Sequence, residues 1–255
     1  MIIGNGMLAR AFAEFKDSEE VVVFASGTAN SLETDQSVFD RETKLLSQVR
    51  NEYRDSLLVY FSTCSIVDPD RWNTPYVQHK IKIAEHLKHA GLPYLVLRLP
   101  VVVGESNLAR TLPFYIRDQI VRGCRLAVWQ NAVRFPIDIE DAVMISSALI
   151  GDKTMHNRCV DVALRAYAVP QIVREMELVL GKTANSDKID RGTEYSIDMR
   201  TAHQLADALH ISYDHAYLGR LLRKYFSLNR GLTKSNAWVE VGDGHQRRSG
   251  SNDGG

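Results

Sequence analysis

The sequence has little of several features that would point to particular classes of protein. It has three cysteines, Cys64, Cys124 and Cys159, with neither close pairing nor metal-ligand spacing, so we expect free thiols in a reducing cytoplasm. No apolar run approaches the roughly 18 residues of a membrane span, and we expect no export signal. Lys plus Arg equals Asp plus Glu, at 31 each, so no excess charge favours nucleic acid or an anionic membrane. A small-molecule substrate is the better expectation, in a cytoplasmic protein that binds neither nucleic acid nor membrane.

Short apolar segments alternate with amphipathic ones through the first hundred residues. The apolar segments are rich in β-branched and aromatic residues and lack a polar face, which is typical of parallel strands covered by helices on both sides. They are Met1–Ile3, Val21–Phe24, Leu57–Phe61 and Tyr94–Leu99, and the helical segments between them are Leu8–Phe15, Val38–Tyr53 and Tyr76–His89. This order predicts an α/β fold with a shortened, Rossmann-like, doubly wound parallel sheet.

The pattern loosens after Gly104, where helices are expected over Leu112–Arg122, from near Asp141, and in the segments 169–182 and 198–210. We therefore expect three regions: a Rossmann-like dinucleotide-binding domain at 1–165, a small, mainly helical substrate-binding lobe at 166–235, and a tail at 236–255. The tail is rich in Gly, Ser, Asn and Arg and has no apolar period, so we expect it to be disordered.

A glycine motif follows the first apolar segment. In IIGNGMLARAF, Gly4, Gly6 and Ala9 have the G-x-G-x-x-A spacing of a dinucleotide-binding turn, where glycines let the backbone approach a pyrophosphate. The alternative is a turn that needs its glycines only for packing. The second strand ends in ASG, where an acid usually binds the adenosine ribose. The adenosine pocket must therefore be built differently or be open.

A tyrosine and a lysine four residues apart begin the third helical segment. Tyr76 and Lys80 would project from one helix face, where the cation can lower the pKa of the phenol toward the working pH. The alternative is a half-exposed tyrosine beside a surface lysine. Just upstream, Thr63, Cys64 and Ser65 end a strand, where a doubly wound sheet has its ligand crevice. Their hydroxyls could bind a substrate carbonyl or could simply cap the strand.

In this order, these motifs and the later segment VLRLPVVVGES resemble the extended short-chain dehydrogenases/reductases over about residues 1–226. The likeness is greatest to the nucleotide-sugar branch, and within it to compact bacterial O-antigen and capsule reductases that act on dTDP-4-keto-6-deoxyhexoses. The resemblance implies NADH- or NADPH-dependent reduction of a sugar ketone. Tyr76 would protonate the carbonyl oxygen, Lys80 would bind the nicotinamide ribose and tune Tyr76, and Thr63 or Ser65 would polarise the ketone.

The resemblance also implies which residues contact the ligands. The expected cofactor contacts are Gly4, Asn5, Gly6, Met7, Leu8, Ala25, Ser26, Gly27, Ser62, Pro100 and Val103. The expected substrate contacts are Asn107, Arg110 and Arg134, with Arg134 on the sugar-linked phosphate and an acidic turn at Asp138 and Asp141 after it. The helices at 38–53 and 76–89 would pair with their copies in a homodimer.

Several other interpretations stay open at this point. A 4,6-dehydratase is disfavoured, because Cys64 and Ser65 stand where such enzymes have an acidic pair. An epimerase, which must retain its cofactor, and a non-catalytic dinucleotide-binding regulatory protein remain alternatives. Cys64 could act as an acid/base or be a buried structural thiol. The histidines of the third helical segment, His79, His86 and His89, are expected on a solvated face and not at a metal.

Overall fold

A single parallel sheet organises the chain, and the computed structural model describes residues 1–105 and 111–227 of it. Five strands form the sheet in the order β1-β2-β3-β4-β9, and every neighbouring pair is parallel. They are β1 (Ile2–Ile3), β2 (Val21–Phe24), β3 (Leu57–Thr63), β4 (Tyr94–Leu99) and β9 (Arg158–Asp161). The α/β class and the first four strands agree with the sequence expectation, whereas β9 was not predicted.

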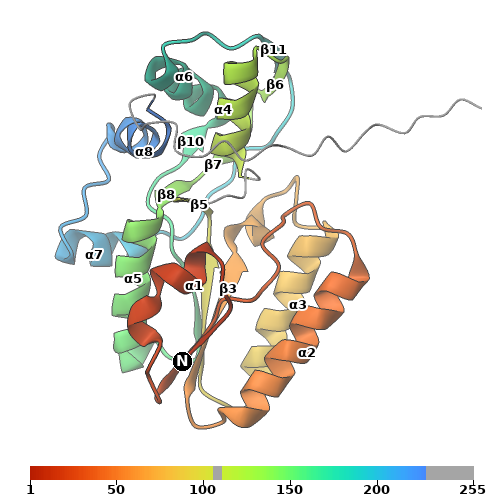
Figure 1. Cartoon of the computed structure of the whole chain (residues 1–255), viewed down its shortest axis with the longest axis vertical. Coiled ribbons are helices and arrows are strands. Elements are labelled where there is room, and N and C mark those ends of the chain that lie inside the picture. The colour runs from red at the N-terminus through yellow and green to blue at the C-terminus, as the bar shows by residue number, and fades with distance from the viewer. Residues whose placement is uncertain (106–110, 228–255) are drawn as a thin grey trace, which may run out of the picture.

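Helices cover both faces of the sheet (Figure 1). On one face, α2 (Gln36–Glu52) and α3 (Pro75–His89) pack Leu46, Val49, Ile83 and Leu87 against the strands. On the other face lie α1 (Met7–Ala11), the short turn η1 (Ala13–Phe15) and α5 (Ile139–Gly151). The sequence sets the start of α3, because Thr74 accepts a hydrogen bond from the Val77 N–H and Pro75 follows in the first turn.

The connection through α1 has an unusual hand. β1, β2 and β3 are neighbours in chain order, so α1 and α2 carry the chain across the sheet in the same direction but on opposite faces. Their crossovers therefore have opposite hands. Because α2 and α3 share a face and about 98% of such crossovers are right-handed, α1 makes the left-handed one.

The connection through α1 differs from the usual one together with the strands that would lie outside β1. In the usual doubly wound order the second and third strands lie outside the first, and the helix after the first strand leads outward to them. Among the described residues no strand lies outside β1, so α1 leads back to the inner neighbour β2. The strand order also shows no reversal within the described residues. The switch point at which such folds normally bind their ligand is thus not formed in the usual way.

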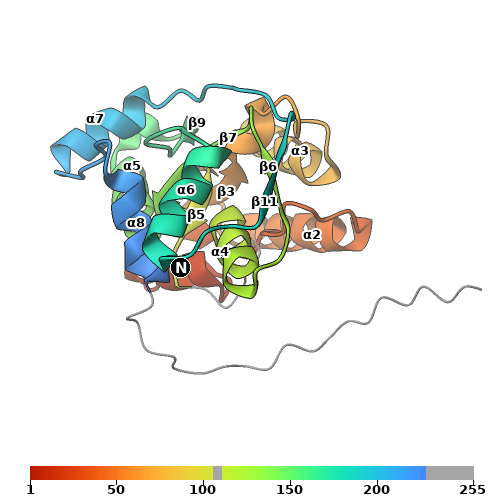
Figure 2. The ribbon, with the colours of Figure 1, turned by 90° about the horizontal axis from the view of Figure 1, so that it is seen from above.

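A smaller lobe lies beyond the carboxyl ends of the strands, as Figures 1 and 2 show. It contains α4 (Leu112–Arg122), β6 (Leu126–Trp129), β7 (Val133–Arg134), β10 (Tyr167–Ala168), α6 (Val169–Leu180), β11 (Ser186–Ile189) and α8 (Tyr217–Phe226). β6 pairs with β11 and β7 with β10. The domain boundary expected at 165/166 stays a prediction; residues 112–134 lie in this lobe, and the chain then returns to the sheet in α5 and β9. The expected disordered tail at 236–255 lies outside the described residues.

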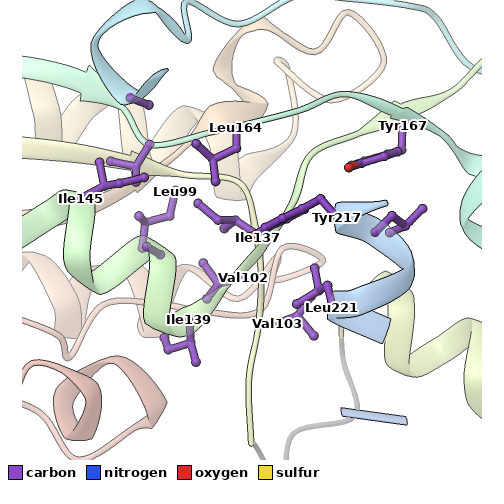
Figure 3. Packing of buried hydrophobic residues seen from close by; sticks show 14 of the residues in the cluster. Leu99, Val102, Val103, Ile137, Ile139, Ile145, Leu164, Tyr167, Tyr217 and Leu221 are labelled. Carbon is purple, nitrogen blue, oxygen red and sulfur yellow. The ribbon is translucent and has the colours of Figure 1, made fainter. Parts of the chain in front are cut away.

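One hydrophobic cluster joins the lobe to the sheet (Figure 3). β5 (Val101–Val103) pairs in parallel with β8 (Pro136–Asp138), and their side chains meet Ile139 of α5 and Leu221 of α8. Val103, which was expected from the sequence to contact the cofactor, has its side chain fully buried in this core. The lobe is therefore seated on the sheet through packed apolar side chains.

Polar contacts fix α8 on the same junction. Tyr217 accepts a hydrogen bond from the Asp138 N–H at 2.9 Å and donates one to Asp141 at 2.6 Å. Lys224 and Tyr225 bind the Asp138 carboxylate at 2.7 and 2.8 Å. The acidic turn recognised in the sequence thus anchors α8, a helix that the sequence analysis did not predict. The remaining helix, α7 (Arg200–Ala208), packs on α5. No helix among the described residues is long and apolar enough to cross a bilayer.

Candidate active site

Thr63, Tyr76 and Lys80 come together at the carboxyl end of β3. Thr63 is the last residue of β3, and its hydroxyl accepts a hydrogen bond from the Ser65 N–H as the turn η2 (Cys64–Val67) begins. Tyr76 lies in the first turn of α3, close enough to Thr63 for that side chain to lower the pKa of its phenol. Lys80 follows one turn later, with its Nζ 5.9 Å from the centre of the Tyr76 ring. Tyr76 and Lys80 are 8% and 2% exposed, so they are not a surface pair.

A buried carboxylate that the sequence analysis missed sits next to the lysine. Glu42 of α2 is 1% exposed, and its Oε1 lies 3.0 Å from Lys80 Nζ. Tyr60 of β3 donates to the same oxygen at 2.6 Å. The other oxygen accepts from the Thr28 N–H at 2.7 Å and lies 3.0 Å from His79 Nε2. Three groups, from β3, α3 and the loop before α2, therefore donate to this carboxylate, and His79 of α3 lies beside it.

Lys80 has its three N–H groups directed at the protein. Its Nζ donates to Glu42 Oε1 at 3.0 Å, to the Tyr60 hydroxyl at 3.0 Å and to the Phe61 carbonyl at 3.4 Å. An ammonium group has three donors. Gly27 covers this pair closely, since a Cβ at that position would lie 2.8 Å from Glu42 Oε1 and 2.9 Å from Lys80 Nζ. The ribose contact expected of Lys80 would require it to give up one of these bonds.

The charges of this network set the protonation of the tyrosine. Burial opposes ionisation of Glu42, but His79, Lys80, Tyr60 and the Thr28 N–H together hold its pKa well below its usual range. Burial lowers the pKa of Lys80, and the adjacent carboxylate opposes that shift. Because the carboxylate is so fully hydrogen-bonded, we take the pair to be ionised at neutral pH. Burial and then the Glu42 charge raise the pKa of Tyr76 to about 12.

The structure separates the three candidates for the third catalytic group. The Thr63 side chain acts on the Tyr76 phenol and lowers its pKa, whereas the Cys64 thiol donates to the Arg98 carbonyl at 3.1 Å. Cys64 is 2% exposed and packs against Phe135 and Val133 in a small apolar cluster, and burial raises the pKa of its thiol well above its usual value. This is the setting of a structural thiol. Ser65 is half-buried and meets Thr63 through its backbone N–H.

The glycine turn lies against the end of β2. Gly4 has φ +132°, and a Cβ there would lie 2.5 Å from the Ala25 carbonyl oxygen, so packing alone requires this glycine. Gly6 differs, because a Cβ on it would meet no other described atom within 4 Å. Met7 and Leu8 pack toward the core, and the Asn5 carbonyl accepts a hydrogen bond from Arg10. Ser26 follows Ala25 and is half-buried, as is Pro100 between β4 and β5; Ser62 is buried within β3.

A dinucleotide fits this site in part. The open backbone at Gly6, beside the Ala25–Ser26 end of β2, leaves room for a pyrophosphate. The nicotinamide half would then reach toward Thr63 and Tyr76 at the end of the next strand. The adenosine half has no counterpart among the described residues, since no strand flanks β1 on its outer side. The expectation of an open or rebuilt adenosine pocket agrees with this arrangement.

Two arginines flank the site on the lobe side. Arg134 lies with its Nη1 3.4 Å from the buried Asp68 carboxylate and donates to the Val133 carbonyl at 2.6 Å. Arg71 is half-buried; burial lowers its pKa, and the neighbouring Arg134 charge adds to that shift. The Arg71 charge also acts on Tyr76. Arg134 was expected from the sequence, and Arg71 was not. The other two expected substrate contacts, Asn107 and Arg110, lie outside the described residues.

The histidines of α3 divide between two environments. His86 and His89 are exposed, as expected. His79 is buried at 7% exposure, stacks on Phe39 and pairs with Glu42, so its expected place on a solvated face is wrong. The reason is that α2 packs over this side of α3. Within the described residues, no group of acidic, histidine or cysteine side chains could hold a metal ion.

Comparison with solved structures identifies the architecture. The dTDP-glucose 4,6-dehydratase of Bacillus anthracis, solved with NAD, superposes with a TM-score of 0.62 at 15% identity, over 86% of this chain and 75% of that one. The UDP-glucuronic acid 4-epimerase of Bacillus cereus, solved with UDP-glucuronic acid and NAD, gives 0.63 at 16% identity, over 84% and 76%. The fold is that of the nucleotide-sugar dehydratases and epimerases.

A third solved structure has the same fold. The UDP-glucose 4-epimerase of Thermus thermophilus, in complex with NAD, matches with a TM-score of 0.60 at 15% identity, over 86% of this chain and 80% of that one. No protein-family model and no curated protein sequence matches the chain. The shared architecture thus establishes the Rossmann-like fold expected from the sequence, at identities where only the fold can be carried over.

Proposed function

We propose that the chain is an NAD(P)H-dependent reductase of a nucleotide-linked 4-keto-6-deoxy sugar. The observation that carries this proposal is the meeting of Thr63 and Tyr76 at the carboxyl end of β3, beside Arg71 and Arg134. A phenol and a hydroxyl can bind a ketone oxygen together, and the two guanidinium groups suit the diphosphate of a nucleotide sugar. From the sequence resemblance we take the substrate to be a dTDP-sugar of bacterial O-antigen or capsule synthesis.

The chemistry divides between the cofactor and the chain. NADH or NADPH, when bound, supplies a hydride to the ketone carbon. Tyr76 donates its phenolic proton to the carbonyl oxygen, so the ketone becomes a secondary alcohol and Tyr76 is left as a phenolate that regains a proton from solvent. Thr63 holds the oxygen and the phenol in line through its hydroxyl. The open turn at Gly6 would hold the cofactor pyrophosphate.

The protonation of Tyr76 favours a reductase over the epimerase alternative. An epimerase begins by taking a proton from a sugar hydroxyl, so it needs the phenolate in its starting state. Burial and the Glu42 charge raise the pKa of Tyr76, which disfavours that phenolate at neutral pH. A reductase starts from the neutral phenol, which is the populated form. The missing adenosine half also suits a cofactor that leaves after each turnover.

The proposal includes the assembly and location that the resemblance implies. We propose a cytoplasmic homodimer in which α2 and α3, which lie side by side on one face of the sheet (Figure 1), pack against their copies. The nucleotide sugar is the proposed partner of the site.

The test measures NADH and NADPH consumption with dTDP-4-keto-6-deoxyglucose. Tyr76→Phe should lower the rate by about 10²–10⁴-fold because it removes the proton donor. Tyr115→Phe is the matched control, since Tyr115 is an exposed tyrosine of α4. Wild-type turnover that survives in folded Tyr76→Phe would refute the assignment of Tyr76. No turnover with a panel of nucleotide-linked keto sugars, in folded protein that still binds a dinucleotide, would favour the non-catalytic binding protein.

A further inference from the structure

The position of Glu42 raises a question that the reductase proposal leaves open. The Tyr76–Lys80 spacing is expected to place an unpaired cation next to the phenol, where it would stabilise the phenolate. In the structure the ammonium instead lies 3.0 Å from the Glu42 carboxylate and 5.9 Å from the centre of the Tyr76 ring. The phenol therefore faces an ion pair, and not a free lysine.

We propose that Glu42 is a positioning residue that acts on Tyr76 through Lys80. By holding the ammonium against itself and Tyr60, Glu42 withdraws the lysine charge from the phenol and keeps Tyr76 in its proton-donating form. This inference rests on the proposed reductase function for its consequence in turnover. Its physical content, the control of Tyr76 by Glu42, concerns the protein alone.

The packing around the pair shows that Glu42 is held in place for this contact. Its carboxylate receives the Thr28 N–H at 2.7 Å and the Tyr60 hydroxyl at 2.6 Å, so it cannot turn away from Lys80 without losing buried hydrogen bonds. Gly27 leaves the space above the pair that any larger residue would fill. A buried ion pair is seldom more stabilising than apolar side chains of the same size. Stability alone therefore gives little reason to place these charges beside Tyr76.

Other charged or polar groups also face Tyr76 and must be separated from the effect of Glu42. They come from α2, β3, η2, the loop before α3, and α3 itself. They are Glu42, Tyr60, Thr63, Cys64, Arg71 and Lys80. Arg71 and Thr63 favour the phenolate, whereas Glu42 and Cys64 disfavour it. A substitution at Glu42 leaves the other groups in place, so it isolates the contribution of the ion pair.

The decisive experiment titrates Tyr76 in the protein without ligand. Ring-labelled tyrosine is followed by NMR as the pH is raised, and the signal missing from Tyr76→Phe identifies the residue. Glu42→Gln should lower the pKa of Tyr76 from about 12 by about 1–3 units, because the negative charge that raises it is removed. Glu85→Gln is the matched control, since it removes an exposed carboxylate from α3 and should leave the titration unchanged. An unchanged Tyr76 pKa in folded Glu42→Gln would overturn the proposal.

A second variant covers the case in which Glu42→Gln does not fold. Glu42→Gln combined with Lys80→Gln removes both charges and leaves two amides that can bond to each other. Because the net charge near Tyr76 is unchanged, its pKa should stay within about one unit of the wild-type value. A rise of more than about one unit would show that Lys80 acts on Tyr76 without cancellation, and would overturn the proposal.

The pH profile of turnover separates this inference from the proposed function. Reduction needs protonated Tyr76, so kcat/KM should fall as the pH rises through the pKa of Tyr76. In Glu42→Gln that fall should move to lower pH by the shift seen in the NMR titration, which a purely structural role of Glu42 would not produce. If the wild type has no turnover, the reductase proposal fails, while the NMR titration still decides the role of Glu42.

Discussion

Removing one charge of the Glu42–Lys80 pair should cost much of the stability of the fold. Glu42→Gln leaves the ammonium of Lys80 buried at 2% exposure without its counter-ion. Breaking a buried ion pair in this way typically costs about 3–5 kcal/mol. An independent limit agrees, because Lys80 can instead release its proton. Neutral pH lies roughly 3.4 units below an ordinary lysine pKa, and each unit costs about 1.4 kcal/mol. Releasing the Lys80 proton at neutral pH therefore costs about 5 kcal/mol.

The protonation of Lys80 determines how the stability of Glu42→Gln changes with pH. In Glu42→Gln the unpaired Lys80 has a lower pKa in the folded than in the unfolded state, so the unfolded chain binds more protons. Stability of the variant should therefore rise with pH and approach the wild type as the pH nears the unfolded lysine pKa of about 10.4. In the wild type the lowered pKa of Glu42 makes stability depend on pH in the acidic range. Its contribution is complete above about pH 4.5 and is lost as the pH falls below that value.

Urea unfolding at pH 7 and pH 9, followed by circular dichroism, measures both effects. With an unchanged slope, the shift in midpoint converts directly to a change in the free energy of unfolding. Glu85→Gln, which breaks only exposed contacts on α3, should change it by less than about 1 kcal/mol. A Glu42→Gln variant as stable as Glu85→Gln at pH 7 would refute the picture of a dry, closed ion pair.

Two further predictions address the glycine turn and the buried thiol. Gly4→Ala should unfold or strongly destabilise the protein, because its Cβ would lie 2.5 Å from the Ala25 carbonyl oxygen, whereas Gly6→Ala should keep the wild-type melting temperature and weaken NADH and NADPH binding measured by calorimetry. If wild type and Gly6→Ala bind the dinucleotide with equal affinity, this turn does not hold the pyrophosphate. Cys124 is exposed and should react with a thiol reagent in the native protein, while Cys64 should react only after unfolding, since it is buried and burial raises the pKa of its thiol. Mass spectrometry of the labelled peptides shows the order of reaction. Early labelling of Cys64 would contradict its structural role.

The sequence predicts the frame of the site because its signals are local. The first four strands are short apolar runs, and the start of α3 follows from Thr74 and Pro75. Tyr76 and Lys80 then share a face by helical spacing alone. The third group could not be chosen from the sequence, because Thr63 and Cys64 are adjacent. Only the direction in which the chain leaves β3 decides that Thr63 meets Tyr76 and Cys64 turns toward the Arg98 carbonyl.

Glu42 was missed because its partners are distant in the sequence. Lys80 is 38 residues away and the Thr28 N–H 14 residues away. One signal could have found it. Phe39, Leu46 and Val49 form the buried stripe of α2, and Glu42 falls on that stripe between them. A charged residue on an apolar helix face needs a buried partner, and the lysine beside Tyr76 was the available cation.

For the proposed dinucleotide ligand, the two departures of this structure from an ordinary dinucleotide site lie at opposite ends. At the adenosine end, the described chain has no strand outside β1. At the nicotinamide end, Glu42, Tyr60 and the Phe61 carbonyl occupy the donors of Lys80. A dinucleotide held mainly at the open turn beside Gly6 has fewer contacts at both ends, so we expect it to dissociate readily. Rapid exchange is what a reductase needs, because it must replace an oxidised cofactor after every turnover, whereas an epimerase must retain the same molecule through two hydride transfers.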